Sequence, residues 1–131
     1  MSFPVRYISA AELAAHLKGP DASSTRVVDV RDDDFGGGCV RTAVNRPAHL
    51  LGEEAYLDRC VAEMAGAKRV VFHCMFSQQR GPVAASLFAA KLQGGVEQPE
   101  VLVLSGGWRG WRREFGDDLT LTQPLPEATD E

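Results

Sequence analysis

The chain has 131 residues, of which 44% are hydrophobic and 24% charged, and its formal net charge is −4. These values are typical of one globular domain with a full hydrophobic core, and the acidic balance argues against a nucleic-acid binder that relies on positive charge. No apolar run approaches the roughly 20 residues that span a membrane, and the first residues lack the apolar core of a signal peptide. We therefore expect a cytoplasmic protein without nucleic-acid or membrane partners.

The first quarter of the chain predicts a strand, a helix and a second strand. Residues 4–9 read PVRYIS and predict a short strand. Ser9 and Glu12 then have the spacing of a capping box, in which each side chain satisfies a free amide, and Gly19 lies where the helix would end. Residues 25–31 read TRVVDVR, a valine-rich run that is typical of a buried strand.

The next segment combines a glycine-rich loop with a further strand and helix. The three glycines at 36–38 argue against a regular element there, and residues 42–46 predict a short strand that Pro47 ends. Residues 52–66 predict a helix with one apolar stripe. The stripe consists of Tyr56, Leu57, Cys60, Val61 and Met64.

The second half of the chain repeats the alternation of strand and helix. Residues 67–74 and 100–107 predict strands, residues 81–95 predict a helix that begins near a proline and ends at a glycine pair, and residues 108–116 predict a short helix. This alternation predicts an α/β fold with a mostly parallel five-stranded sheet and helices on both faces. We expect one domain over residues 1–120 and an acidic, disordered tail over residues 121–131.

The cysteines and histidines do not predict a disulfide framework or a metal site. The three cysteines form no CxxC pair and leave one thiol unpaired, so reduced thiols are expected. No spacing of cysteine and histidine is typical of zinc.

Residues 73–82 read HCMFSQQRGP and carry the strongest chemical signal. Cys74 ends a predicted strand, which is where ligands bind in open α/β sheets, and the helix that follows directs its free amides at the loop. Such a position stabilises a thiolate, and Arg80 adds a planar charged group that can hold two oxygens. The pattern predicts a cysteine nucleophile that faces an oxyanion site. Its expected ligands are the loop residues Met75, Phe76, Ser77, Gln78, Gln79 and Arg80.

The same segment resembles the active-site loop of the M-phase inducer phosphatases, which are dual-specificity enzymes with a rhodanese fold. It is more similar still to that of the small eukaryotic arsenate reductases related to them. Residues 27–48, with Asp-x-Arg, a glycine-rich loop and Gly-x4-Ala-x-Asn, and residues 101–108, with Gly-Gly before a tryptophan, also resemble the rhodanese pattern. The resemblance spans residues 5–115 and implies a single rhodanese-like domain.

The resemblance implies a role for each matching residue. It makes Cys74 the nucleophile, Arg80 the oxyanion ligand and His73 the residue that tunes the thiolate, whereas Asp29 and Arg31 form a structural pair. Sulfurtransferases of this fold usually have a loop one residue shorter. The longer loop implies phosphate or arsenate as the bound anion and argues against sulfur transfer.

The leading hypothesis is a thiol-dependent arsenate reductase that also acts on antimonate and has phosphatase activity as a second activity of the same loop. The resemblance implies glutathione and glutaredoxin as external reductants, with no bound cofactor. One alternative is a protein tyrosine or dual-specificity phosphatase that works through a phosphocysteine on phosphate esters. Another is a non-catalytic rhodanese-like binding module.

Three features leave the chemistry open. The cell-cycle phosphatases carry two loop glutamates where this chain has Met75 and Gln78 or Gln79, so a proton donor would come from the substrate or from Asp32, Asp33 or Asp34. That acidic run is interpreted as a solvated turn.

Cys39, in a mobile loop, and Cys60, on a helix, are candidate resolving thiols, but both are interpreted as structural. The tryptophans at 108 and 111 are expected to pack, with neighbouring arginines at the edge.

Overall fold

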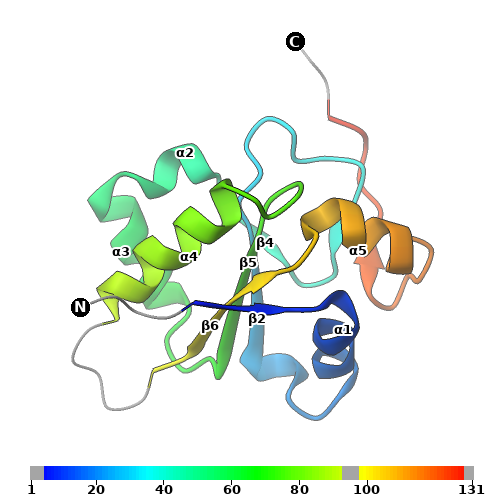
Figure 1. Ribbon diagram of the computed structural model, residues 1–131, viewed down its shortest axis with the longest axis horizontal. Helices are drawn as coiled ribbons and strands as arrows, with labels where there is room; N and C mark the ends of the chain where they lie inside the picture. The colour runs from blue at the N-terminus through cyan, green and yellow to red at the C-terminus, as the bar shows by residue number, and fades with distance from the viewer. Residues whose placement is uncertain (1–4, 93–97, 129–131) are drawn as a thin grey trace.

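The computed structural model describes residues 5–92 and 98–128 and has a five-stranded parallel sheet at its centre (Figure 1). Every neighbouring pair of strands in this sheet is parallel, as the alternation of strands and helices predicted. In spatial order the strands are β1 (Arg6–Ile8), β6 (Glu100–Leu104), β5 (Arg69–His73), β2 (Thr25–Asp29) and β4 (Val44–Asn45).

Helices cover both faces of the sheet, which confirms the predicted architecture (Figure 1). One face carries α1 (Ala10–Lys18) and α5 (Gly107–Phe115), and a short 3-10 helix (Ala22–Ser24) follows α1. The other face carries α2 (Ala48–Leu51), α3 (Glu54–Glu63) and α4 (Arg80–Lys91). None of the helices in the described residues is long and apolar enough to cross a membrane.

Consecutive residues of the strands supply the two halves of the core. In β2, Val27 packs into the cluster beneath α1 and α5, whereas Val28 packs into the cluster beneath α2, α3 and α4. In β5, Val71 and Phe72 divide in the same way. Because side chains alternate along a strand, a sheet buried on both faces needs continuous apolar runs. Each buried side chain of this size stabilises the fold by about 1.5–3 kcal/mol.

Most predicted helix boundaries lie close to the observed ones. Ser9 accepts a hydrogen bond from the amide of Glu12 and completes the predicted capping box, and the helix ends next to Gly19. Of the predicted stripe on α3, Leu57 and Cys60 are buried, and Met64 follows them into the core just after the helix. The predicted stop of α4 at residues 94–95 lies outside the described residues.

The C-terminal segment differs from the expected tail. Residues Thr122–Gln123 form β7, which pairs antiparallel with β3 (Cys39–Val40) in a second small sheet. Leu121 is buried, and Trp111 donates a hydrogen bond of 2.9 Å from Nε1 to Oγ1 of Thr122. The domain therefore continues beyond the predicted boundary at residue 120, because one leucine and one threonine anchor an otherwise polar segment. Residues 129–131 of the predicted tail lie outside the described residues.

Candidate active site

The loop between β5 and α4 lies at the carboxyl edge of the parallel sheet (Figure 1). Cys74 is the first residue after β5, and α4 begins at Arg80. The valine-rich sequence of β5 places the start of the loop in the core, while the following helix needs its first amides satisfied. The structure therefore has the predicted order of strand, cysteine, loop, arginine and helix.

The thiol of Cys74 is buried against the start of α4. Its Sγ accepts a hydrogen bond of 3.3 Å from the amide of Gly81, and the residue is 3% exposed. An amide at a helix N-terminus carries a partial positive charge and stabilises a thiolate more than a thiol. A Cβ atom at Gly81 would lie 3.3 Å from Cα of His73, so glycine allows the helix to approach the cysteine this closely.

A cavity of about 220 Å³ opens in front of the thiol, and it is the expected place for an anion. Four of the six predicted oxyanion ligands line it together with the nucleophile. The lining residues are Cys74, Phe76, Gln78, Gln79 and Arg80. That the loop amides hold the anion stays a prediction.

The other two predicted ligands, Met75 and Ser77, are not among the residues that line this cavity. Met75 lines a second, larger cavity beside the loop. Ser77 is 4% exposed, has a φ of 57°, and its Oγ finds no hydrogen-bond partner among the described residues. A positive φ is uncommon for a residue with a side chain and occurs mostly where a loop is held in a required shape. Their contribution to an anion site would come from the backbone.

Arg80 is held by two carboxylates of the loop that follows β2. Its Nη2 donates to Oδ2 of Asp34 at 2.7 Å and its Nη1 to Oδ1 of Asp34 at 2.8 Å, while Nη1 also reaches Oδ2 of Asp32 at 3.2 Å. The hydrogen bond from Arg80 lowers the pKa of Asp34 against the opposing effect of burial. The acidic run is therefore not simply a solvated turn, because two of its members hold Arg80.

His49 extends this network from α2. Its amide and its Nδ1 contact Oδ1 of Asp32 at 2.9 and 2.7 Å. Burial raises the pKa of Asp32, but these contacts and the hydrogen bond from Arg80 outweigh it, so the pKa is lowered overall. Both aspartates thus carry charge near neutral pH. Sequence reasoning missed His49, because it lies 17 residues from its partner and on a helix too short to show periodicity.

His73 contacts the backbone of the cysteine. Its Nδ1 lies 3.0 Å from the carbonyl oxygen of Cys74, and its Nε2 lies 3.7 Å from Oδ2 of Asp29. Complete burial lowers the pKa of His73, so the ring is neutral near pH 7 and Nδ1 donates to the carbonyl. The predicted tuning of the thiolate would therefore act by fixing the main chain at Cys74.

The Asp29–Arg31 pair has the predicted structural role. Both side chains are fully buried, and Nη2 of Arg31 donates to Oδ2 of Asp29 at 2.7 Å. The same guanidinium donates to the carbonyl oxygens of Gly36 and Gly38 at 3.0 and 2.8 Å. Asn45 closes the group by donating to the carbonyls of Asp29 and Arg31. The pair therefore holds the glycine-rich loop whose aspartates contact Arg80.

The first backbone amides of α5 bind carbonyl oxygens at the start of the loop between β5 and α4. The amides of Trp108 and Arg109 donate to the carbonyl oxygens of Cys74 and Met75 at 2.9 and 3.0 Å. Gly107 has a φ of 58°, and a Cβ atom there would lie 2.6 Å from the oxygen of Cys74. Glycine at 107 thus lets the start of α5 position the backbone of Cys74 and Met75.

We expect Gly107→Ala to destabilise the fold. The left-handed backbone disfavours alanine, and the added methyl group must displace the backbone of the catalytic loop. The free energy of unfolding should fall by about 1–3 kcal/mol, measured by urea denaturation. Gly52→Ala is the matched control, because Gly52 has helical angles and no atom lies within 4 Å of its Cβ position. Equal stability of the two variants would refute the close approach.

The other two cysteines are also buried. Cys39 belongs to β3 and is 4% exposed, so its expected place in a mobile loop is wrong. Pairing of β3 with β7 explains the difference. Burial raises the pKa of Cys39 and of Cys60, which is unfavourable for reactive thiols. In the part of the chain that the structure describes, no three His, Cys, Asp or Glu side chains gather to hold a metal ion.

Comparison with known proteins agrees with this geometry. Residues 9–114 match the Rhodanese-like domain. The chain belongs to this family. It is 34% identical to the CDC25-like phosphatase YCH1 of Saccharomyces cerevisiae, over 90% of this chain and 88% of that protein. It is 32% identical to arsenate reductase 2.2 of Oryza sativa subsp. japonica, over 85% of each. The predicted resemblance to both groups of rhodanese-fold enzymes is confirmed.

A solved structure adds a third likeness. The As-Sb reductase of Leishmania major superposes with a TM-score of 0.77 at 32% sequence identity, covering 88% of this chain and 81% of that one. Relatives of this rhodanese-like domain are thus named as phosphatases and as reductases of arsenic and antimony. Which of these activities this chain has is a matter for proposal.

Proposed function

We propose that this protein is a thiol-dependent arsenate reductase that also accepts antimonate. The arrangement around Cys74 is the observation that carries the proposal. Its sulfur accepts a hydrogen bond from the amide of Gly81, and Cys74 and Arg80 line the same small cavity. A stabilised thiolate beside a fixed positive charge suits attack on a tetrahedral oxyanion. A relative of nearly the same length that is named an arsenate reductase supports the choice.

In the first step the Cys74 thiolate attacks arsenic(V) of bound arsenate. An S–As bond forms, one As–O bond breaks, and the departing oxygen takes up a proton from the buffered solvent and leaves as water. Arg80 and the loop amides would hold the remaining oxygens, so the charge that moves onto them stays in contact with fixed donors. Because hydroxide or water is the leaving group, the step makes small demands on a proton donor.

An external thiolate would complete the reaction by attacking Sγ of Cys74. A disulfide forms, the S–As bond breaks, and its electron pair remains on arsenic, which leaves as arsenite. A second thiol, from glutathione or glutaredoxin, then exchanges with the mixed disulfide and releases Cys74 as thiolate. The two thiols together lose the two electrons that arsenic gains.

A phosphatase acting through a phosphocysteine is the second candidate. It is supported by the yeast relative named as a phosphatase and by the same cysteine and arginine. An alkoxide leaving group needs a proton donor, yet the nearest carboxylates, Asp32 and Asp34, have lowered pKa values and are bound to Arg80. This pairing favours arsenate, whose leaving group is water or hydroxide.

Glutathione and glutaredoxin are the proposed reductants, because the other two thiols are buried and unfavourable for reaction. We expect a variant with both Cys39→Ala and Cys60→Ala to keep glutathione-dependent turnover within about threefold of the wild type, provided that it folds. Circular dichroism and urea unfolding provide the check on folding. A folded variant that loses turnover by more than about tenfold would assign the resolving thiol to this chain instead.

The proposed function is tested by arsenate-dependent NADPH oxidation with glutathione, glutaredoxin and glutathione reductase. Turnover that needs both arsenate and glutathione would support the proposal. Hydrolysis of an aryl phosphate without any thiol, and no arsenate turnover, would favour the phosphatase. Absence of both activities in a folded protein would leave the non-catalytic binding module. A cytoplasmic location remains a prediction.

A further inference from the structure

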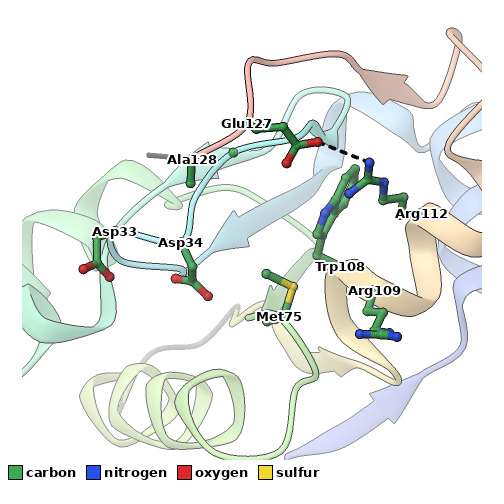
Figure 2. Close-up of a pocket in the computed structure, with 9 residues that line it drawn as sticks. Asp33, Asp34, Met75, Trp108, Arg109, Arg112, Glu127 and Ala128 are labelled. Carbon is green, nitrogen blue, oxygen red and sulfur yellow. Dashed lines mark hydrogen bonds and ion pairs between the residues drawn. The ribbon is translucent and has the colours of Figure 1, made fainter. Parts of the chain in front are cut away.

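A second cavity, of about 520 Å³, lies between α5, the loop after β2 and the C-terminal segment (Figure 2). Its wall on α5 carries Trp108 and two arginines, Arg109 and Arg112, and its opposite wall carries Asp33 and Asp34. The cavity therefore presents positive charge on one side and negative charge on the other.

This cavity adjoins the catalytic loop. Met75, the residue after the nucleophile, forms part of its lining, and Asp34 lines it while holding Arg80. The guanidinium of Arg109 lies 5.7 Å from the ring centroid of Phe76, which lines the cavity in front of the thiol. Residues of the same loop thus line both cavities, and the paired side chains of Asp34 and Arg80 line the larger and the smaller one respectively.

One carboxylate already occupies the arginine side. Oε1 of Glu127, from the C-terminal segment, accepts from Nη2 of Arg112 at 3.4 Å (Figure 2). The two side chains are 74% and 54% exposed, so water screens the pair and it is easily exchanged. A carboxylate from another molecule can therefore compete for Arg112.

Two of the three glycines in the loop after β2 contact the segment that carries this carboxylate. The amide of Gly37 donates to the carbonyl oxygen of Pro126 at 2.8 Å. A Cβ atom at Gly37 would lie 2.8 Å from Oε2 of Glu127, and one at Gly36 would lie 2.4 Å from the backbone nitrogen of Ala128. Because glycine has no side chain, these positions leave space for residues 126–128, which carry Glu127 to the edge of the cavity.

We propose that Arg109 and Arg112 form a subsite for the carboxylates of the thiol that resolves the Cys74 adduct, and that Glu127 occupies this subsite when no thiol is bound. The inference rests on the proposed function. A thiol with carboxylates at both ends and one ammonium group, as in glutathione, matches the charges of the cavity. Its carboxylates would face the arginines, and its ammonium group would face Asp33.

Binding of S-methylglutathione tests the subsite without any reaction, because this analogue has no free thiol. By titration calorimetry at low ionic strength, we expect Arg109→Gln with Arg112→Gln to weaken binding about tenfold or more, because two charge-assisted hydrogen bonds are lost. Glu127→Gln removes the internal competitor and should tighten binding about threefold. Arg113→Gln is the matched control, an exposed arginine on the same helix that is not among the residues lining this cavity.

Kinetics supply a second measurement. The double variant should raise KM for glutathione about tenfold more than it raises KM for 2-mercaptoethanol, which has no carboxylate. Failure of the proposed function would appear as no arsenate turnover in the wild type, and S-methylglutathione binding would still decide the subsite. Wild-type binding in the double variant, an equal loss in Arg113→Gln, or no binding to the wild type would overturn the inference.

Discussion

Cys74→Ser is expected to lose arsenate-dependent turnover by at least about 10⁴-fold while keeping the fold, because removal of a nucleophile eliminates the covalent pathway. A serine hydroxyl does not ionise near neutral pH, and one amide hydrogen bond from Gly81 does not change that. The hydroxyl can still accept that hydrogen bond and fill most of the space of the thiol. The measurement is NADPH oxidation at saturating arsenate and glutathione, with circular dichroism to verify the fold.

Cys60→Ser provides the matched control for this result. This variant makes the same change at Cys60, a buried core residue on α3 that is not part of the loop between β5 and α4. Its stability can fall, but the turnover per folded molecule should stay close to that of the wild type. Retention of more than about a tenth of the wild-type turnover by Cys74→Ser would show that another group attacks arsenate.

The elements with strong local patterns were predictable from the sequence. Valine-rich runs such as residues 25–31 are buried on both faces of the sheet, and the capping box at Ser9 starts a helix as expected. The catalytic loop was predictable for the same reason. Its cysteine follows a buried strand and its arginine opens a helix, so the two local signals fix the position of both side chains.

The remaining structure depends on contacts between distant segments. The strands β3 and β7 have two residues each and pair across more than 80 residues of chain, so neither shows a periodic pattern. The three glycines indicated only a loop. Their close contacts with Trp108, Glu127 and Ala128 are set by how α5 and the C-terminal segment pack, and no local signal carries that information.

The pairing of Arg80 with Asp34 is the main feature of the site that the sequence analysis did not predict. The two residues are 46 positions apart, and the acidic run was considered as a proton donor or a solvated turn. In the structure both Nη atoms of Arg80 donate to Asp34, and Nη1 also donates to Asp32. Among the described residues these bonds use three of the five N–H donors, which leaves the Nε–H and one N–H of Nη2 for an arriving oxyanion. The two aspartates thus fix the orientation of the guanidinium before an anion binds.

Arg80→Lys is therefore expected to lower kcat/KM for arsenate about 10²–10³-fold, because an ammonium group cannot hold two oxygens in the plane of a guanidinium. The lysine ammonium group also cannot reproduce the two parallel hydrogen bonds that Arg80 donates to Asp34. It would therefore be drawn toward one carboxylate and away from the anion. Alkylation of Cys74 by iodoacetamide, which is neutral, should change little, since the amide of Gly81 still contacts the sulfur. Arg113→Lys is the control for a surface arginine on α5. A value of kcat/KM within about tenfold of the wild type would mean that the loop amides, and not the guanidinium, hold the anion.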